Sequence, residues 1–489
     1  MKKSIAAALL FVLAFGLCAC QKAPERSIVT SKNDGAFEAA LKETSEPTAA
    51  PEGADMTEPT PEPVLYEDSF TGAAGGIAFT LSLTEPNITS ALPVLRARPM
   101  EITSEMAQRI ARAIFGDAEM YEYSEQPTRA EIEESILGLS RHISDWGALV
   151  DYYDGDEKLA ASVKEDFESR IAKLEALYET ASDTVQPEPC AWEFHPWSYY
   201  LDPAFGDFPD EGHRLIQATA TLDGTPYVFS VCNREAEDYI IHNATVYIDD
   251  RLVSSENVYT DTDETPDMDA LRERALSMVE AMDIGQWALA PDGTVDMLGF
   301  NSNGSMSAVV LTRVYNGMQA SYHTGGDGGS EDEYAARYAD ERILFRFNGE
   351  RLIEFSYEGA LQVTETANEN VQILPFEEIL EQAKVQMQMM NPERFLYYSP
   401  ESVLTVEAEQ VELGLSRIRV KNSSADYYLT PTYTFYGAAK QYDASGEPVM
   451  LQWYNSEGDI VKETEASQFM ELAVINAVDG SAVNTQLGY

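Results

Sequence analysis

Histidine and cysteine are the scarce reactive side chains of this 489-residue chain. The five histidines are His142, His195, His213, His242 and His323. None stands at a helical spacing from another, and the sequence has no HExxH motif or Cys/His cluster, so we expect no zinc centre. It also has no GxSxG elbow, Walker A loop or dinucleotide fingerprint, and no Ser-x-x-Lys with the partner motifs of penicillin-binding enzymes. These absences predict a protein without catalytic residues.

Cys20 has the surroundings of a lipidation site. A basic start, Met1-Lys2-Lys3, precedes an apolar run that ends in Leu17-Cys18-Ala19-Cys20. Because Leu and Ala stand three and one positions before Cys20, the pattern matches a bacterial lipobox. We therefore predict a signal peptide over residues 1–19 and a diacylglyceryl (palmitate-type) anchor on Cys20, which holds the protein at the extracellular face of the cell membrane. The alternative is an ordinary cleaved signal followed by a fortuitous cysteine.

Two thiols remain after processing, Cys190 and Cys232, each within a predicted strand. An exported protein can form disulfides, and closing this loop would stabilise the chain by about 3–4 kcal/mol. A Cys190–Cys232 disulfide is therefore one hypothesis. Two buried, unpaired thiols are the other.

Carboxylates dominate the charge, with 83 Asp and Glu against 33 Lys and Arg, a net charge of −50. Without the two lysines of the signal peptide the mature chain has 83 acids against 31 bases, or −52. Such a charge excludes nucleic acid, anionic lipid and wall polyanions as partners. Three clusters of carboxylates could bind calcium weakly. None fits an EF-hand loop, and charge exposed to solvent in loops is the other explanation for these clusters. The clusters are Asp151/Asp154/Asp156, Asp261/Asp263/Asp267/Asp269 and Asp327/Glu331/Asp332.

Aromatic residues gather after residue 190. Alternation places Trp192 and Phe194 on one strand face, where they would fill core. Trp197, Tyr199 and Tyr200 stand between prolines in a predicted loop and are the candidate ligand-binding residues, because aromatic rings stack on sugars and grip peptides.

The pattern of the chain predicts an α+β fold. Residues 20–64, rich in Pro, Thr and Glu, are predicted to be a disordered tether, with a short helical turn near 35–41. Residues 65–300 form an N-terminal module, in which a capping box at Thr128 opens a helical hairpin over about 128–180. Its two helices are expected to close a core against each other and a sheet. Residues 301–489 form a C-terminal module. The order hairpin, loop, helix, strand occurs in both modules, which indicates either an internal duplication or a chance match.

Further elements are predicted from local patterns. Period-two stretches predict strands at 77–83, 190–195, 214–222, 227–233, 244–248, 252–259, 286–290, 308–315, 343–347 and 351–357. Helices are expected at 103–115, 268–282 and 376–390. Asn348-Gly349 is the strongest predicted hairpin turn.

Several segments carry a family resemblance: Cys190-Ala191-Trp192-Glu193-Phe194-His195-Pro196, Ile373-Leu374-Pro375-Phe376-Glu377-Glu378-Ile379, Leu429-Thr430-Pro431-Thr432-Tyr433-Thr434-Phe435-Tyr436-Gly437 and Leu472-Ala473-Val474-Ile475-Asn476-Ala477-Val478-Asp479-Gly480-Ser481. They resemble a family of Gram-positive, clostridial-type lipoproteins known as a domain of unknown function. The C-terminal third is also similar to extracytoplasmic accessory regulators of the YycH/YycI type, which are tandem PepSY-like modules. The resemblance implies a regulatory or binding role and brings no catalytic residues. The lipid anchor, in place of a transmembrane helix, puts direct contact with a membrane-embedded kinase in doubt.

We therefore expect a lipid-anchored binding or regulatory protein of the cell envelope, without a cofactor, that meets a protein or peptide partner. A solute- or glycan-binding lipoprotein that uses the aromatic patch is the alternative. An unrecognised hydrolase built from carboxylates is the third possibility.

Overall fold

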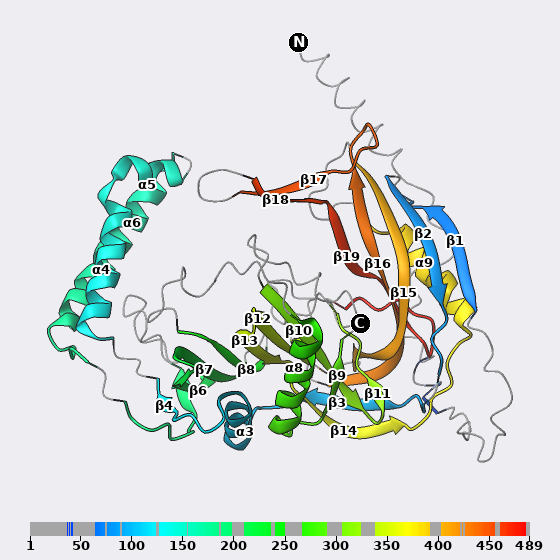
Figure 1. Cartoon of the computed structure of the whole chain (residues 1–489), viewed down its shortest axis with the longest axis horizontal. Coiled ribbons are helices and arrows are strands. Elements are labelled where there is room, and N and C mark those ends of the chain that lie inside the picture. Colours follow the sequence, from blue (N-terminus) through cyan, green and yellow to red (C-terminus); the bar gives the residue numbers. More distant parts are fainter. Residues whose placement is uncertain are drawn as a thin grey trace, which may run out of the picture.

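The computed structural model describes residues 37, 39, 41–42, 64–73, 76–88, 90–123, 127–153, 155–184, 187–197, 210–235, 240–249, 267–290, 306–323, 338–391, 402–420, 423, 426–454 and 460–485. They form an α+β structure with two large, mainly antiparallel sheets, as the sequence predicts (Figure 1). No helix within these residues is long and apolar enough to cross a membrane.

The seven-stranded sheet contains both early and late segments of the chain. Its strands, in spatial order, are β1 (Leu65–Thr71), β2 (Ile77–Thr84), β15 (Val403–Arg419), β16 (Tyr427–Tyr442), β3 (Val94–Pro99) and β14 (Leu361–Asn368), with β19 (Ser467–Asn476) also on β16. The β2–β15 pair is parallel and the others are antiparallel. Helix α9 (Phe376–Gln388) packs Phe376, Ile379 and Leu380 into the core on one face of this sheet.

The ten-stranded sheet carries the hairpins that the alternation predicts. Its strands, in spatial order, are β11 (Met318–Gln319), β10 (Met306–Tyr315), β12 (Arg342–Asn348), β13 (Arg351–Glu358), β8 (Ile240–Ile248), β7 (Thr225–Glu235), β6 (Asp210–Leu222) and β4 (Tyr121–Glu122), with β5 (His195–Trp197) on β6 and β9 (Gln286–Leu289) on β10. Helices α3 (Ser104–Phe115) and α8 (Met268–Met282) share one core with this sheet. A separate pair, β17 (Met450–Tyr454) and β18 (Ile460–Glu465), forms a two-stranded ribbon.

Each large sheet takes strands from both sides of residue 300. The predicted module boundary at 300 therefore does not separate the two sheets. Strands β1 to β3 lie far from β14 to β16 in sequence, and local patterns do not say which distant strands pair.

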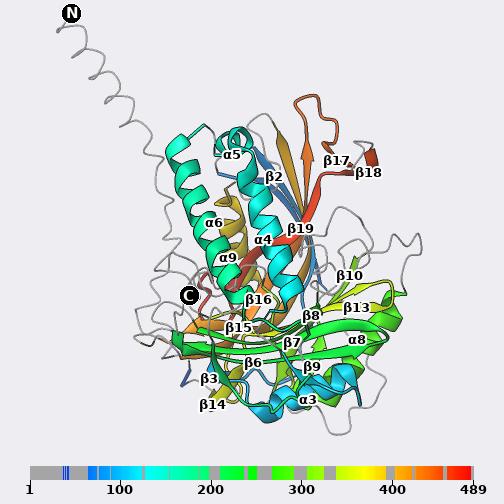
Figure 2. The same ribbon diagram turned by 90° about the vertical axis from the view of Figure 1, so that its left-hand side faces the viewer.

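The helical hairpin forms as predicted but is less buried than expected. It consists of α4 (Arg129–Ser144), α5 (Trp146–Tyr152) and α6 (Glu157–Tyr178), and Thr128 and Glu131 make the predicted capping box. It rises on the side of the ten-stranded sheet away from α3 and α8 (Figure 2). Of the apolar residues that recur at helical spacing on the two helices, Ile132, Leu149 and Leu174 are buried, whereas Trp146 and Leu159 are 41% and 47% exposed. The expectation that the two helices close a core against each other and a sheet is therefore wrong at Trp146 and Leu159.

Two local predictions are also wrong. The 190–195 stretch is not a strand: Pro189 makes an isolated bridge to Tyr121, and Trp192 has a positive φ of 59° that breaks the extended backbone. Asn348 pairs with Arg351, so the β12–β13 turn is Gly349-Glu350 rather than Asn348-Gly349. The predicted strand at 252–259 lies outside the described residues.

Part of the predicted tether is docked on the body. The backbone N–H of Leu41 donates to the carbonyl of Phe37 at 2.9 Å, which makes a helical turn. The Phe37 ring lies 5.5 Å from that of Tyr428, and the Asn368 side-chain amide donates to the Leu41 carbonyl at 2.7 Å. The helical turn predicted near 35–41 is therefore confirmed, and it packs against the folded body instead of standing free in the tether.

Candidate functional site

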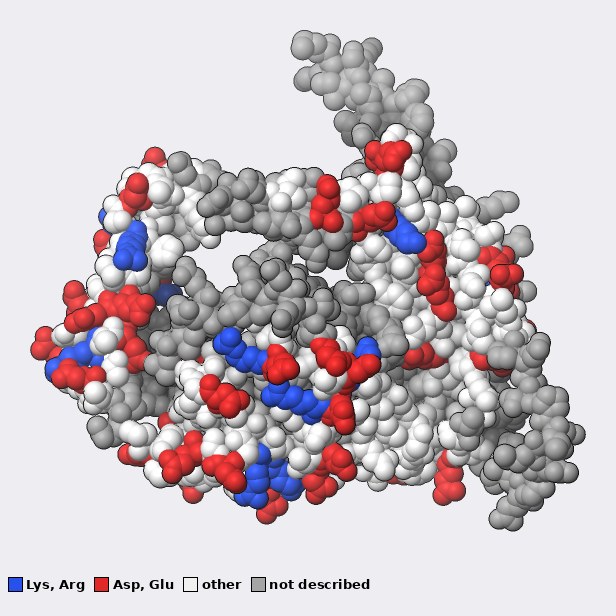
Figure 3. All heavy atoms as spheres, viewed as in Figure 1, with Lys and Arg blue, Asp and Glu red and all other residues white. Residues whose placement is uncertain are grey.

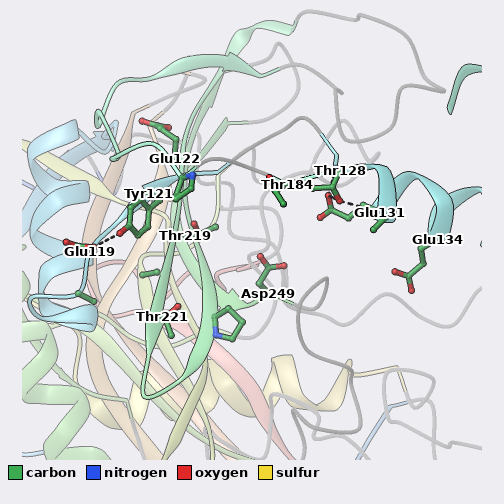
Figure 4. Close-up of a pocket in the computed structure, with 15 residues that line it drawn as sticks. Glu119, Tyr121, Glu122, Thr128, Glu131, Glu134, Thr184, Thr219, Thr221 and Asp249 are labelled. Atoms are coloured by element: carbon green, nitrogen blue, oxygen red, sulfur yellow. Dashed lines mark hydrogen bonds between the residues drawn. The ribbon is translucent and has the colours of Figure 1, made fainter. Parts of the chain in front are cut away.

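A cavity of about 860 Å³ lies at the base of the helical hairpin (Figure 4). We call it the hairpin-base pocket. It is lined by Ala118, Glu119, Tyr121, Glu122, Thr128, Ala130, Glu131, Glu134, Thr184, Pro187, Thr219, Ala220, Thr221, Pro226 and Asp249. Its volume is within the range of small-molecule and peptide-segment sites.

The sheet provides one wall of the pocket. Strand β4 adds to the edge of β6 and places Tyr121 opposite Thr219. Thr219 and Thr221 stand two residues apart on β6, so they point to the same face of the strand. Asp249 follows the end of β8, where its backbone N–H donates to the carbonyl of Pro226 at 3.0 Å.

The start of the hairpin provides the opposite wall. The Thr128 backbone N–H donates to Oε2 of Glu131 at 2.7 Å, and the Thr128 hydroxyl caps the helix in return. Arg129 ties this turn to the chain after α6, because its guanidinium lies 3.1 Å from the Asp183 carboxylate. The hairpin root is thereby positioned against the sheet, and Glu134 stands one turn further along α4.

Five carboxylates line the pocket, and none of the described residues that line it is Lys or Arg. Glu119 accepts from the Tyr121 hydroxyl, which raises the pKa of Tyr121. Glu122 accepts from the backbone N–H of Ala191 at 2.6 Å. Glu134 is exposed, and Asp249 is only 1% exposed. Negative groups around a concave surface reinforce one another, so the pocket favours a cation.

The remaining lining is mainly apolar. Alanine and proline side chains, with the methyl groups of four threonines, form the surface between the carboxylates. An apolar wall with a few charged groups is typical of a site that takes an amphipathic ligand. The arrangement therefore suits a positive charge attached to an apolar body.

The residues predicted to bind a ligand are only partly described. Trp197 lies in β5, paired with Asp210, and its side chain is outside the described part. Tyr199, Tyr200 and the predicted lipidation residue Cys20 also lie outside the described residues. Of their neighbours, Trp192 packs edge-on against Phe229 at 6.0 Å, as the prediction of a core role required.

Cys190 and Cys232 are not bonded to each other in the structure. Burial raises the pKa of Cys190 to about 11. The sulfur of Cys232 lies 3.0 Å from Nε2 of His213. The predicted disulfide is therefore not present in the structure, and each thiol has neighbours of its own.

The acidic clusters proposed for calcium do not assemble into a metal site within the described residues. No group of three or more His, Cys, Asp or Glu side chains there could hold a metal ion. Asp156 instead caps α6, with Oδ1 accepting from the backbone of Leu159 at 3.1 Å, and Asp267 caps α8 in the same way. Asp154, Asp261, Asp263, Asp327, Glu331 and Asp332 lie outside the described residues.

The structure also brings together three residues that sequence reasoning missed. His323 Nε2 lies 2.8 Å from the Ser416 hydroxyl, and His323 Nδ1 lies 2.6 Å from Oε2 of Glu471. These contacts have the order and distances of a Ser-His-acid triad. The sequence carries no signal for them, because 93 and 148 residues separate His323 from its partners.

The surroundings of this His323 triad argue against catalysis. Ser416 is 2% exposed and His323 is 3% exposed. The serine stands within β15, opposite Thr430, and also shares its hydroxyl with Thr432. A nucleophile must reach its substrate and have oxyanion donors beside it, whereas this serine is covered and its strand is paired. The triad therefore serves as a buried polar network that joins β15 to β19.

Comparisons with known proteins leave the family open. No protein-family model matches the chain, and no curated protein matches it. Among solved structures, an uncharacterized protein from Eubacterium rectale is similar over 84% of this chain and 91% of its own, with 10% sequence identity and a TM-score of 0.35. A similarity of that size carries no argument about function.

Proposed function

We propose that this protein is a lipid-anchored binding protein of the bacterial cell envelope, whose hairpin-base pocket takes a basic segment of a peptide or protein partner. The pocket carries this proposal, because five carboxylates and apolar side chains line it and its described lining contains no Lys or Arg. A lysine or arginine has the matching chemistry, with a long apolar stem and a positive head.

The proposal includes the predicted lipid anchor and the predicted similarity to YycH/YycI-type modules. Lipidation at Cys20 would hold the chain at the extracellular face of the membrane, where envelope partners are found. The tandem YycH/YycI-like modules would be the two large sheets, each with its own helical layer: α3 and α8 on one, and α9 on the other. A non-enzymatic role is consistent with the burial of Ser416.

The binding test uses two fluorescent hexapeptides that differ only in charge, one with alternating Lys and Leu and one with alternating Glu and Leu. Fluorescence anisotropy with the mature protein should show binding of the lysine peptide alone. The double variant Glu134→Gln, Asp249→Asn removes two of the five pocket charges and should weaken binding about tenfold. Neither substitution touches the capping pair, so the hairpin root should stay folded.

The matched control is Glu273→Gln, Glu280→Gln on α8, which removes the same charge on the opposite side of the sheet. Affinity should stay within about twofold of the wild-type value at physiological salt, because exposed charges that far away are screened. An equal loss in both double variants would mean that net charge, rather than the pocket, attracts the peptide. Binding of the glutamate peptide with similar affinity would also overturn the proposal.

The anchor is tested in cells. Cys20→Ser should release the protein from the membrane fraction into the medium and abolish its labelling by radioactive palmitate. Cys18→Ser, two positions earlier in the same segment, should change neither. Retention of the label in the Cys20 variant would contradict the predicted anchor.

A further inference from the structure

A second cavity, of about 350 Å³, opens where two central strands of the ten-stranded sheet part. The ladder between β8 and β13 ends at the pair Ala244–Tyr357, whereas β8 continues along β7 as far as Ile240. His242 lies on this continued part of β8 and lines the cavity, which we call the His242 pocket.

His242 is buried, and the described residues give its ring no hydrogen-bond partner at normal geometry. Only 1% of His242 is exposed, and neither ring nitrogen has a hydrogen bond within the described residues. Its Nε2 is 3.8 Å from the Glu235 carboxylate, which is too far for a hydrogen bond. Tyr338 packs edge-on against the ring at 5.8 Å, but its hydroxyl donates to the carbonyl of Ala360 at 2.5 Å.

An unpaired buried ring nitrogen is costly. Burying a polar group without a hydrogen bond removes its bonds to water with nothing in return, and most buried polar atoms in proteins have a partner. The cavity beside His242 gives such a partner room. A bound ligand is therefore a physical reason for placing a histidine at this position.

The walls of the His242 pocket select against charged ligands. Burial lowers the pKa of His242 to about 4, so the ring is neutral at physiological pH and has one donor and one acceptor. The Arg342 guanidinium is paired with the Glu358 carboxylate at 2.9 Å, so the charges of the wall are balanced. The other Glu358 oxygen accepts from the hydroxyl of Ser356 at 2.7 Å.

We propose that the His242 pocket binds a small uncharged ligand with an amide group, which hydrogen bonds to the His242 ring. An amide suits this site because it has both a donor and an acceptor and no charge. The volume is at the lower end of the range for ligand sites, which fits a ligand of one or two residues. The site is separate from the hairpin-base pocket, since His242 lies near the start of β8 and Asp249 follows its end, about 23 Å away along the extended chain.

The test is nuclear magnetic resonance of the mature protein labelled with ¹⁵N in its histidine rings. Propionamide is the probe, and propionate and propylamine are charged controls of nearly the same size. The neutral amide at millimolar concentration should shift the His242 ring signals alone, and neither charged control should do so. His242→Gln identifies the signal by its loss.

Variants decide whether the ring itself binds the probe. Measured by thermal shift, His242→Phe should abolish the stabilisation by the amide, whereas His242→Gln, which keeps a donor and an acceptor, should retain part of it. His195→Phe, on an exposed histidine, should leave the stabilisation unchanged. Unchanged His242 signals with the amide would mean that water alone fills the cavity and would overturn the proposal, as would full binding to His242→Phe. If His242→Phe fails to fold, the ring signals of the wild-type protein still decide.

Discussion

His242 and His323 are both almost fully buried, and they differ in the partners of their ring nitrogens. The ring of His242 has none within the described residues, and burial lowers its pKa to about 4. Both nitrogens of His323 have partners, Ser416 and Glu471. Burial opposes protonation of His323, but the Glu471 carboxylate outweighs it and raises the pKa of His323 above its usual value. The same side chain is therefore neutral at one site and favours its charged form at the other.

The His323–Glu471 pair makes a pH-dependent contribution to stability. Because the pKa of His323 is higher in the folded state, its contribution is complete below about pH 6.5 and is lost as the pH rises through the raised pKa. Glu471→Gln should therefore cost about 3 kcal/mol of unfolding free energy in mild acid and clearly less in mild base. Urea unfolding at the two pH values measures the difference.

Thr485→Val is the matched control for this substitution. It removes only the hydrogen bond that the Thr485 hydroxyl donates to Oε1 of Glu471, at 3.2 Å. Its cost should be small, about 1 kcal/mol, and nearly the same at both pH values. A loss in Glu471→Gln that does not change with pH would contradict a charged pair.

At the scale of elements, local signals predicted helices well and irregular backbone poorly. The bounds of α8 were predicted correctly, because Asp267 caps its first turn and its apolar residues recur with helical spacing. The 190–195 stretch alternates like a strand, but Trp192 has left-handed backbone there. Alternation depends only on which side chains are apolar and contains no information about the backbone angle φ. The interruption of the strand at Trp192 therefore could not be predicted.

Gly359 marks a close approach between elements that the sequence does not reveal. It follows β13 with a φ of +67°, and an added Cβ would lie 2.5 Å from the carbonyl oxygens of Ala339 and Asp340. Gly446 has a φ of +88° and open space around it. Gly446→Ala should cost about 1–2 kcal/mol, the cost of left-handed backbone alone.

Gly359→Ala should cost more, about 3 kcal/mol or above, because two backbone carbonyls must also move. Urea unfolding of both variants gives the comparison. Equal losses of unfolding free energy in the two variants would show that the segment containing Ala339 and Asp340 moves easily, and would contradict a close contact at Gly359.

At the scale of the whole molecule, a buried ion pair links the two sheets. Glu341 accepts from Arg313 of β10 at 2.8 Å, from the Tyr357 hydroxyl of β13 at 3.1 Å and from the backbone N–H of Leu361 of β14 at 3.2 Å. Strands β10 and β13 belong to the ten-stranded sheet, and β14 belongs to the seven-stranded one. These donors compensate the buried carboxylate, and they hold the sheets in one arrangement.

The acidic charge itself is spread widely. On the face that Figure 3 shows, acidic side chains are scattered over the hairpin, the ribbon and the body rather than gathered at one place. The net charge therefore restricts the partners without marking a site. The hairpin-base pocket differs from that surface because its carboxylates surround a cavity.

The docked turn at Phe37 shortens the reach of the tether. If Cys20 carries the anchor, residues 21–36 remain between the lipid and the turn, with a random-coil span of about 20–24 Å, against about 35–40 Å for residues 21–64. Phe37→Ala should weaken docking by about 1–2 kcal/mol, because a half-buried aromatic ring is lost. The ratio of docked to undocked protein should then fall by about 5- to 30-fold.

A nitroxide label on Lys42→Cys reports this change as faster motion in its electron paramagnetic resonance spectrum. Phe37→Leu, which keeps an apolar side chain, should stay mostly docked, and global unfolding should be nearly unchanged in both variants. Equal mobility in the wild type and in Phe37→Ala would contradict the docked turn.

The sequence by itself determined the charge, the helix caps and most of the strands, because these depend on composition and on neighbours within a few residues. Only the tertiary structure decided which distant strands pair, where the two pockets open and which partners His242 and His323 meet. Ser416 and Glu471 stand far from His323 in sequence, and Asp249 meets the hairpin root only through the folding of the sheet. Such contacts depend on non-local strand register and packing, which no local pattern contains.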